Sequence, residues 1–255
     1  MATVHDGTDE YPTETSGFVP GHLALLDELG TKVASGALPE GQVITLAGLE
    51  NELNASRTAV REVIKVLENL GMVRSKRRVG ITIQPRTSWS ILDPQLISWR
   101  MANPEERQAF FGEMSELRRG IEPEAARLAA SRASRDLALQ LRDMAVRMRA
   151  LGAQGQGAGT EFLELDKRFH TQLLRCSSNE IFSHMAPLIE SLLTERTYWK
   201  LQPAYPSQQA MDAHVRVAEC ILARDAVGAW DACSFIVSQA EEEVRGLEDL
   251  ATGTV

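Results

Sequence analysis

Basic side chains gather in one short stretch of a chain that is acidic as a whole. The 255 residues carry a formal net charge of −8, yet residues 53–86 hold eight basic residues against two acidic ones. The basic residues are Arg57, Arg61, Lys65, Arg74, Lys76, Arg77, Arg78 and Arg86. Lysine and arginine concentrated in this way are typical of a surface that binds the phosphates of a nucleic acid.

The first half of this stretch has the spacing of an amphipathic helix that begins after Ser56. Apolar residues at helical intervals predict its buried face: Val60, Val63, Ile64, Leu67 and Leu70. The opposite face carries hydrogen-bond donors: Arg57, Thr58, Arg61 and Lys65. With Ser56 as N-cap, Arg57 and Thr58 fall in the first turn, where a recognition helix presents side chains to the major groove. An arginine there can donate two hydrogen bonds to one guanine.

A short β-hairpin is expected directly after this helix. Gly71 ends the helix, and residues 72–75 and 81–83 read as two strands. The turn between them carries three cations and a glycine: Lys76, Arg77, Arg78 and Gly80. Such a tip is either a solvated run of charge or the wing of a winged helix, which contacts the DNA backbone or minor groove. The basic helix beside it favours the wing.

Two further helices are predicted upstream, over residues 22–36 and 45–53, which completes a helix-turn-helix followed by a wing. Over about residues 20–84 the sequence resembles the GntR family of bacterial regulators. The resemblance rests on Gly-Ala-Leu-Pro-Glu-Gly at 36–41, Ala-Ser-Arg-Thr-Ala-Val-Arg-Glu at 55–62 and Leu-Glu-Asn-Leu-Gly-Met-Val at 67–73. It implies contacts to double-stranded operator DNA by Arg57, Thr58, Arg61 and the wing around Arg77 and Gly80.

A second group of residues that could do chemistry lies further along the chain. Asp166 and His170 are four residues apart on a predicted helix, so their side chains lie on one side and could hold one cation or bond to each other. The surrounding sequence predicts helices alone, over residues 110–132, 136–151, 160–176, 179–200, 207–223 and 226–247. The expected fold is mainly α: an N-terminal winged helix-turn-helix and a C-terminal antiparallel α-helical bundle.

The helical part resembles the FCD effector domain of FadR-type GntR regulators over about residues 105–245. The resemblance rests on residues 116–130, on Leu-Asp-Lys-Arg-Phe-His at 165–170 and on Ser-Asn at 178–179. Residues 85–94 and Trp99 further resemble regulators of sugar-acid catabolism. These likenesses imply a repressor that binds a sugar acid or another small carboxylate in this domain and acts as a homodimer.

The same resemblance implies a metal site, because members of the family often hold a divalent ion with one carboxylate and three histidines. Asp166, His170 and His214 match three of these ligands, whereas the fourth position is Ile236, which cannot ligate. One interpretation is a three-ligand Zn²⁺ site completed by water or by the carboxylate of the effector. The other is a metal-free pocket in which Arg118, His170 and His214 bind an anion directly. Arg118 matches an arginine that lines this pocket in the family.

These observations predict four segments: a tail at 1–19, the DNA-binding domain at 20–85, a linker at 86–103, and an effector-binding and dimerisation domain at 104–248. No apolar run could span a bilayer and the N-terminal residues lack the apolar centre of a signal peptide, so we expect a cytoplasmic protein with no membrane contact. Two other functions stay open, a metal-dependent hydrolase with a DNA-binding appendage and a DNA-binding dimer without an effector. The sequence has no HExxH or GxSxG motif, which argues against an enzyme.

Overall fold

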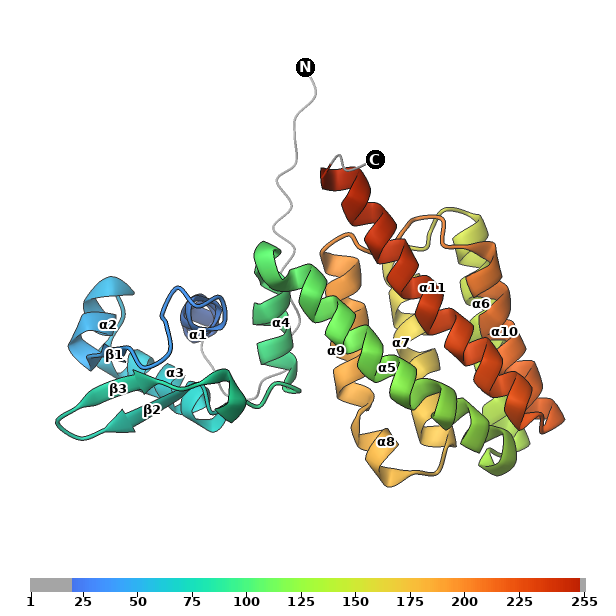
Figure 1. Cartoon of the computed structure of the whole chain (residues 1–255), viewed down its shortest axis with the longest axis horizontal. Coiled ribbons are helices and arrows are strands. Elements are labelled where there is room, and N and C mark those ends of the chain that lie inside the picture. Colours follow the sequence, from blue (N-terminus) through green and yellow to red (C-terminus); the bar gives the residue numbers. More distant parts are fainter. Residues whose placement is uncertain (1–19, 253–255) are drawn as a thin grey trace, which may run out of the picture. The chain divides into compact units, whose positions relative to one another are not determined.

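The computed structural model describes residues 20–252, which form two compact units that part between Trp89 and Ser90 (Figure 1). The tail expected at residues 1–19 lies outside the described residues. Within the described range, no helix combines the length and the apolar character that crossing a membrane requires. Each unit buries apolar side chains of its own and therefore has its own core.

The first unit combines three helices with a small antiparallel sheet (Figure 1). Its elements are α1 (Pro20–Ala34), β1 (Val43–Ile44), α2 (Leu46–Glu52), α3 (Arg57–Asn69), β2 (Val73–Lys76), β3 (Gly80–Ile83) and the short 3-10 turn η1 (Arg86–Ser88). The strands lie in the order β1-β3-β2, with Val43 opposite Thr82 and Lys76 opposite Gly80. The predicted winged helix-turn-helix is confirmed, with one addition: β1 has two residues and is too short for a periodic pattern.

Helix α3 begins and ends where the sequence predicts, because both ends have a local cause. The Ser56 hydroxyl accepts a hydrogen bond from the Ala59 N–H at 3.2 Å and caps the first turn. At the other end Gly71 has φ +72°, and a Cβ on it would lie 2.1 Å from the Ser88 carbonyl oxygen. Only glycine fits there. The face between these ends is fully buried at Val60, Val63 and Leu67.

The second unit is an all-helical bundle (Figure 1). Its helices are α4 (Pro94–Ala102), α5 (Pro104–Arg132), α6 (Arg135–Ala153), α7 (Thr160–Cys176), α8 (Glu180–His184), α9 (Ala186–Tyr198), α10 (Gln208–Ala223) and α11 (Ala226–Thr252). The long helices α5 and α11 lie side by side, α10 packs on α6 and α11, and α7 packs on α5, α6 and α9. The largest apolar core is shared by α5, α6, α7, α10 and α11, so residues far apart in sequence meet in its centre.

The expected linker at residues 86–103 contains a packed helix. Helix α4 contacts α5 and α9, and it buries Leu96, Ile97, Trp99 and Met101. Asp93 accepts a hydrogen bond from the Gln95 N–H at 2.9 Å and starts the helix, and Asn103 followed by Pro104 ends it. Helix α4 has nine residues, which is too short for a clear apolar period. The sequence pattern therefore did not predict a helix here.

The prediction of one helix over residues 179–200 is wrong. The segment forms α8 and α9, which part at Met185, and Pro187 lies in the first turn of α9. Proline has no N–H to continue a helical ladder but is tolerated in a first turn, so the chain restarts there.

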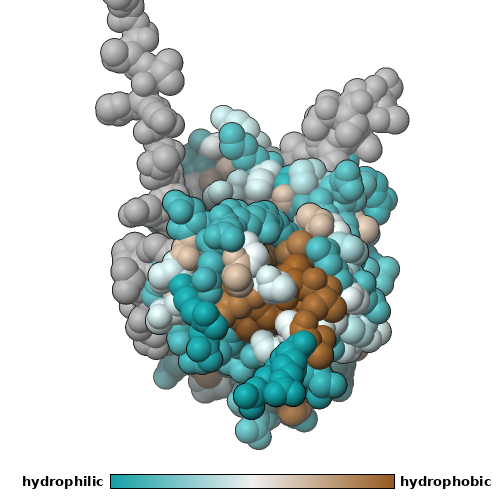
Figure 2. All heavy atoms as spheres, turned by 90° about the vertical axis from the view of Figure 1, so that its left-hand side faces the viewer, coloured by the Kyte–Doolittle hydropathy of each residue, from teal (hydrophilic) through white to brown (hydrophobic). Residues whose placement is uncertain are grey.

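Some large apolar side chains reach the surface of both units. Figure 2 shows an apolar area bordered by hydrophilic side chains on the face that it draws. Exposed examples are Val43 and Val79 in the first unit and Val227 and Trp230 in the second. Val227 and Trp230 are three residues apart on α11 and therefore share a face of that helix.

Candidate functional site

Helix α3 carries the predicted DNA-facing donors on its exposed side. Arg57, Thr58, Arg61 and Lys65 are all exposed. Arg57 lies 3.8 Å from Glu50, and Lys65 lies 2.7 Å from Glu62, so neither ion pair removes its cation from solvent. The Ser56 hydroxyl is engaged by the helix cap. The structure therefore offers a row of arginine, threonine and lysine side chains on a helix whose opposite face is held in the core.

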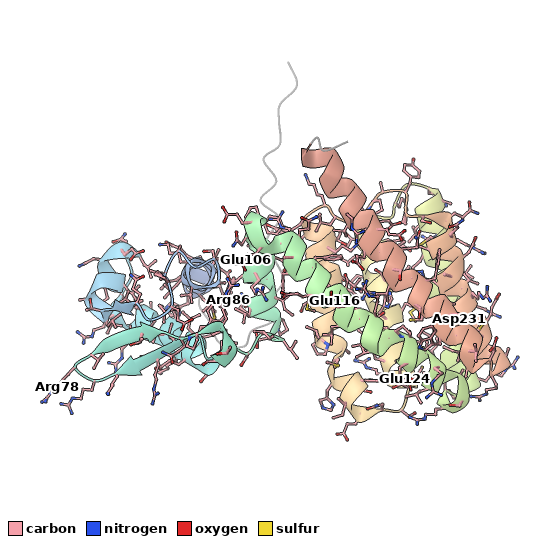
Figure 3. All side chains as sticks on the ribbon, viewed as in Figure 1. Arg78, Arg86, Glu106, Glu116, Glu124 and Asp231 are labelled. Carbon is pink, nitrogen blue, oxygen red and sulfur yellow. The ribbon has the colours of Figure 1, made fainter. Side chains whose placement is uncertain are left out.

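The β2–β3 hairpin presents the second basic group. Arg78 lies at the far end of the hairpin (Figure 3), where its φ of +64° helps the chain to turn. The Val79 N–H donates to the Lys76 carbonyl at 3.1 Å and closes the turn. Lys76, Arg77 and Arg78 are exposed, and among the described residues Arg77 and Arg78 have no acidic partner. Three clustered cations without counter-charges suit a phosphate backbone.

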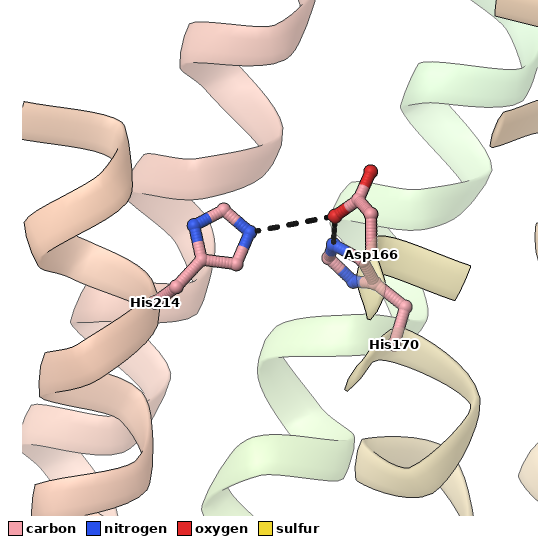
Figure 4. A group of neighbouring side chains, drawn as sticks. All are labelled: Asp166, His170 and His214. Atoms are coloured by element: carbon pink, nitrogen blue, oxygen red, sulfur yellow. Dashed lines mark ion pairs between the residues drawn. The ribbon is translucent and has the colours of Figure 1, made fainter. Parts of the chain in front are cut away.

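The second unit brings the three predicted ligands together. Asp166 and His170 come from α7 and His214 from α10 (Figure 4). The Asp166 Oδ1 atom lies 3.3 Å from His170 Nε2 and 3.7 Å from His214 Nε2. One ligand atom from each residue lies within 4.8 Å of the others, and all three residues are buried. The sequence predicted this meeting only through resemblance, since 44 residues separate His170 from His214.

The Nδ1 atom of each imidazole ring lies close to an oxygen atom of the protein. The His214 Nδ1 atom lies 2.7 Å from the Ala210 carbonyl oxygen, and the His170 Nδ1 atom lies 2.7 Å from Glu122 Oε2, an ion-pair contact that is not aligned as a hydrogen bond. A proton on each Nδ1 leaves the Nε2 atoms to face Asp166, which is how metal-binding histidines are commonly oriented. His214 Nε2 is buried and has no hydrogen-bond partner among the described residues. An orphaned nitrogen beside a carboxylate and a second imidazole fits a divalent metal.

Electrostatics inside the bundle set the charge of this cluster. Burial alone would raise the pKa of Glu122, but Arg118 and His170 outweigh it and lower that pKa to about 2. Burial likewise opposes ionisation of Asp166, yet His170 and His214 hold its pKa well below the ordinary value. Burial would lower the pKa of His170, whereas Glu122 and Asp166 raise it to about 9. At neutral pH the metal-free protein therefore has two buried carboxylates and a protonated His170.

Arg118 is placed at this site but is already paired. Its Nε lies 2.6 Å from Glu122 Oε1 and its Nη2 lies 3.3 Å from Glu122 Oε2. Arg118 is 1% exposed and Glu122 is fully buried. Glu122 thus bridges Arg118 and His170, and the ion pair neutralises the guanidinium charge.

A small cavity adjoins the cluster. Its volume is about 20 Å³, enough for a water molecule or an ion. The side chains that line it include Arg118, Phe162, Asp166, His170, Arg196, Gln202, His214, Ile236 and Glu243. Ile236, the residue at the fourth ligand position, is 3% exposed and lies in this lining. The side chain at the fourth ligand position is therefore apolar, although charged side chains line other parts of the cavity.

The sequence did not predict that Glu122 and Arg196 belong to this site. Glu122 follows Arg118 by four residues on one helix, so their ion pair is a signal that the sequence did carry. Arg196 carries no such signal, because its partner Glu243 lies 47 residues away on another helix. It lies in α9 with its Nη2 2.8 Å from Glu243 Oε2 on α11.

Comparison with known families agrees with both units. Residues 23–83 match the family described as bacterial regulatory proteins, gntR family, and residues 113–236 match the FCD domain family. The chain belongs to the GntR family and carries an FCD domain. This GntR protein is a DNA-binding transcription regulator, and since the family and its relatives are regulators and not enzymes, the hydrolase alternative has no support.

Curated relatives are similar along most of their length. The uncharacterized HTH-type transcriptional regulator YieP of Escherichia coli is 25% identical over 219 residues, which cover 86% of this chain and 93% of that protein. The galactonate operon transcriptional repressor of Escherichia coli is 26% identical, covering 85% of this chain and 93% of the repressor. A solved structure of Lar from Listeria monocytogenes has a TM-score of 0.57 at 14% identity and covers 91% of this chain and 100% of Lar. That last likeness concerns the fold alone.

Proposed function

We propose that this regulator is a repressor whose DNA binding is controlled by a small carboxylate, such as a sugar acid, bound in the cavity of the second unit. The observation that carries the proposal is the buried group formed by Asp166, His170 and His214, in which His214 Nε2 lacks a hydrogen-bond partner among the described residues. Buried polar atoms without partners are rare and are typical of sites that receive a ligand. The similarity to a galactonate operon repressor supports both the repressor role and the ligand class.

We further propose that Asp166, His170 and His214 hold a divalent metal, with Zn²⁺ as the ion best suited to two imidazoles and one carboxylate. Such an ion supplies a Lewis-acidic position that an effector carboxylate can fill. Ile236 offers no fourth protein ligand, which leaves that position to the effector or to water. A sugar acid is larger than a cavity of about 20 Å³, so its binding requires lining side chains to move.

For the first unit, we propose that the α3 face reads bases and the hairpin binds backbone. The base-reading group consists of Arg57, Thr58 and Arg61. Lys65 and the backbone near Ser56 contact the DNA next to this group. The wing group consists of Lys76, Arg77, Arg78 and Gly80. Gly80 has φ +122°, and a Cβ on it would lie 2.8 Å from the Ile44 carbonyl oxygen, so glycine lets the hairpin lie close to β1.

We also propose a homodimer that reads two half-sites. One winged domain buries too little DNA surface for tight specific binding, and two copies related by a two-fold axis fit a near-palindromic operator. In this assignment residues 20–85 bind DNA, and residues 104–248 together with α4 bind the effector and the second copy.

The proposal is tested by measuring DNA release. Duplexes selected by the protein from a random pool serve as operator, and fluorescence anisotropy follows binding as D-galactonate or D-gluconate is added, with and without Zn²⁺. We expect an aldonate to weaken operator binding while neutral galactitol has no effect. In Asp166→Ala the response should vanish while operator binding remains. A protein that holds its operator equally with every aldonate would be the effector-independent dimer instead.

A further inference from the structure

Two arginines line the cavity, and they differ in how their hydrogen-bond donors are used. Arg118 gives both Nε and Nη2 to a single carboxylate, Glu122. Arg196 gives only Nη2 to its partner, Glu243. The Arg196 Nε atom is buried and has no hydrogen-bond partner within residues 20–252. A buried guanidinium N–H without an acceptor costs free energy until an acceptor arrives.

The surroundings of Arg196 are suited to a carboxylate that enters from the cavity. Arg196 is 5% exposed, so an anion bound to it would meet little competition from water. Glu243 and Asp166 attract its charge and Arg118 repels it, yet Glu243 is shared, because its Oε1 accepts the Ser207 N–H at 2.8 Å. Gln202 also lines the cavity, and its side chain has no hydrogen-bond partner in the part of the chain that the structure describes.

We propose that Arg196 is the anchor for the carboxylate of the effector and that Glu243 holds its guanidinium in place until the effector binds. The inference rests on the proposed function, since it assigns a residue to the ligand of the same cavity. It also specifies the ligand as a carboxylate that carries hydroxyl groups. One carboxylate oxygen supplies the acceptor that Arg196 Nε lacks and leaves the other oxygen for the open metal position, and a hydroxyl can pair with the Gln202 amide, while the rest of the molecule meets apolar walls such as Phe162 and Ile236.

Glu243 competes with the effector in this arrangement. An effector carboxylate and Glu243 are both anions that pair with one guanidinium, so each weakens the binding of the other. Removal of the Glu243 charge should therefore strengthen effector binding. If Arg196 only tied α9 to α11, loss of its partner would instead loosen the cavity and weaken binding.

The test measures D-galactonate and D-gluconate binding to the full-length, zinc-loaded protein by titration calorimetry. The variants are Arg196→Gln, Glu243→Gln and the double variant, which removes both members of the buried pair and so avoids leaving one charge alone. A glutamine at 243 still offers an oxygen to the Ser207 N–H. Arg147→Gln is the matched control, because Arg147 is likewise paired with one glutamate, Glu161, but lies in an exposed ion pair outside the cavity lining.

We expect Arg196→Gln and the double variant to bind the aldonate tenfold to a hundredfold more weakly than the parent, with zinc content unchanged. Glu243→Gln should bind it at least threefold more tightly, and Arg147→Gln as the parent does. Unchanged affinity in Arg196→Gln, or weaker binding in Glu243→Gln, would overturn the role of Arg196 and leave the proposed function intact. A parent protein that binds neither aldonate would overturn both.

Discussion

Glu122 Oε2 lies 2.7 Å from His170 Nδ1, and both side chains are buried. Arg118 forms an ion pair with the same carboxylate, and its Nε lies 2.6 Å from Oε1. The three side chains form a chain from α5 to α7 that fixes the ring of His170. Outer partners of this kind orient a ligand and raise its basicity. Glu122 is therefore a positioning residue for the cluster, and it acts on the site through its contact with His170.

The first prediction concerns this contact. Glu122→Gln keeps the size of the side chain but removes its charge, so His170 is held less firmly and is a poorer ligand. Loss of such an outer partner typically costs tenfold to a hundredfold in metal affinity. We expect a Zn²⁺ affinity lower by that factor at pH 9, where few protons compete with zinc for His170, when zinc is competed against a fluorescent chelator.

A matched control lies one half-turn away on the same helix. Glu124 (Figure 3) is half-buried and pairs with Arg127 at 2.7 Å. Glu124→Gln should leave the zinc affinity as it is. Equal affinities of the Glu122→Gln and Glu124→Gln proteins would show that the contact to His170 has no part in metal binding.

The second prediction concerns pH. Metal binding needs a neutral imidazole, and Glu122 and Asp166 raise the pKa of His170 to about 9 in the metal-free protein. Below that pH each zinc ion must displace a proton, so the apparent zinc affinity should fall about tenfold per pH unit between pH 9 and 7. An isolated histidine, with its ordinary pKa near 6.5, would show no fall in that window.

Chelator competition at several pH values measures this slope. Glu122→Gln removes one of the two charges that raise the pKa of His170. The apparent zinc affinity of this variant should therefore begin to fall at a lower pH than that of the parent. A parent affinity that stays constant from pH 7 to 9 would mean that His170 is neutral before the metal arrives.

How far the sequence predicts this molecule depends on how local each cause is. Helix α3 follows from its own apolar period, the Ser56 cap and Gly71, all within 16 residues. Helix α4 has local signals at its ends, the Asp93 cap and Pro104, but it is short, and its buried face becomes apparent only from its packing on α5 and α9. Arg196 is the extreme case, since its buried ion pair depends on Glu243, which lies 47 residues away on another helix. Interactions between helices decide such positions, and no spacing along the chain reports them.

The third prediction concerns DNA recognition. Arg57→Ala and Arg61→Ala should each weaken operator binding by about 1–3 kcal/mol, the usual worth of a base-edge contact. Binding to random duplex should change less, because the loss concerns sequence reading. Anisotropy titrations with selected and scrambled duplexes measure both quantities.

The wing provides the comparison. Arg77→Ala or Arg78→Ala removes a phosphate contact, so affinity should fall evenly for all sequences and the salt dependence should flatten by about one unit per cation lost. If Arg57→Ala lowered the affinity for both duplexes equally and also flattened the salt slope, α3 would be a backbone contact and not the reading helix.

The fourth prediction concerns assembly. A two-fold dimer of the 28.1 kDa chain should scatter light as a particle of about 56 kDa in dilute solution. On a selected operator the complex should contain two chains per duplex. A particle that stays at the mass of one chain both free and on DNA would contradict the dimer.

The last prediction concerns the missing ligand. Ile236 is 3% exposed and lines the same cavity as Asp166, His170 and His214, so a histidine at this position has access to the metal. Ile236→His should raise the zinc affinity at least tenfold, because a fourth protein ligand closes the tetrahedral shell. In the metal-free state the new imidazole is a buried polar group without an assigned partner, so the variant should melt below the parent and gain more from zinc. D-galactonate should strengthen zinc binding in the parent, where it can fill the open position, but not in Ile236→His.

Ile236→Val, which keeps an apolar side chain, is the control and should behave as the parent in the same chelator competition. A zinc affinity that is equal in Ile236→His and Ile236→Val would show that the metal does not face this wall of the cavity.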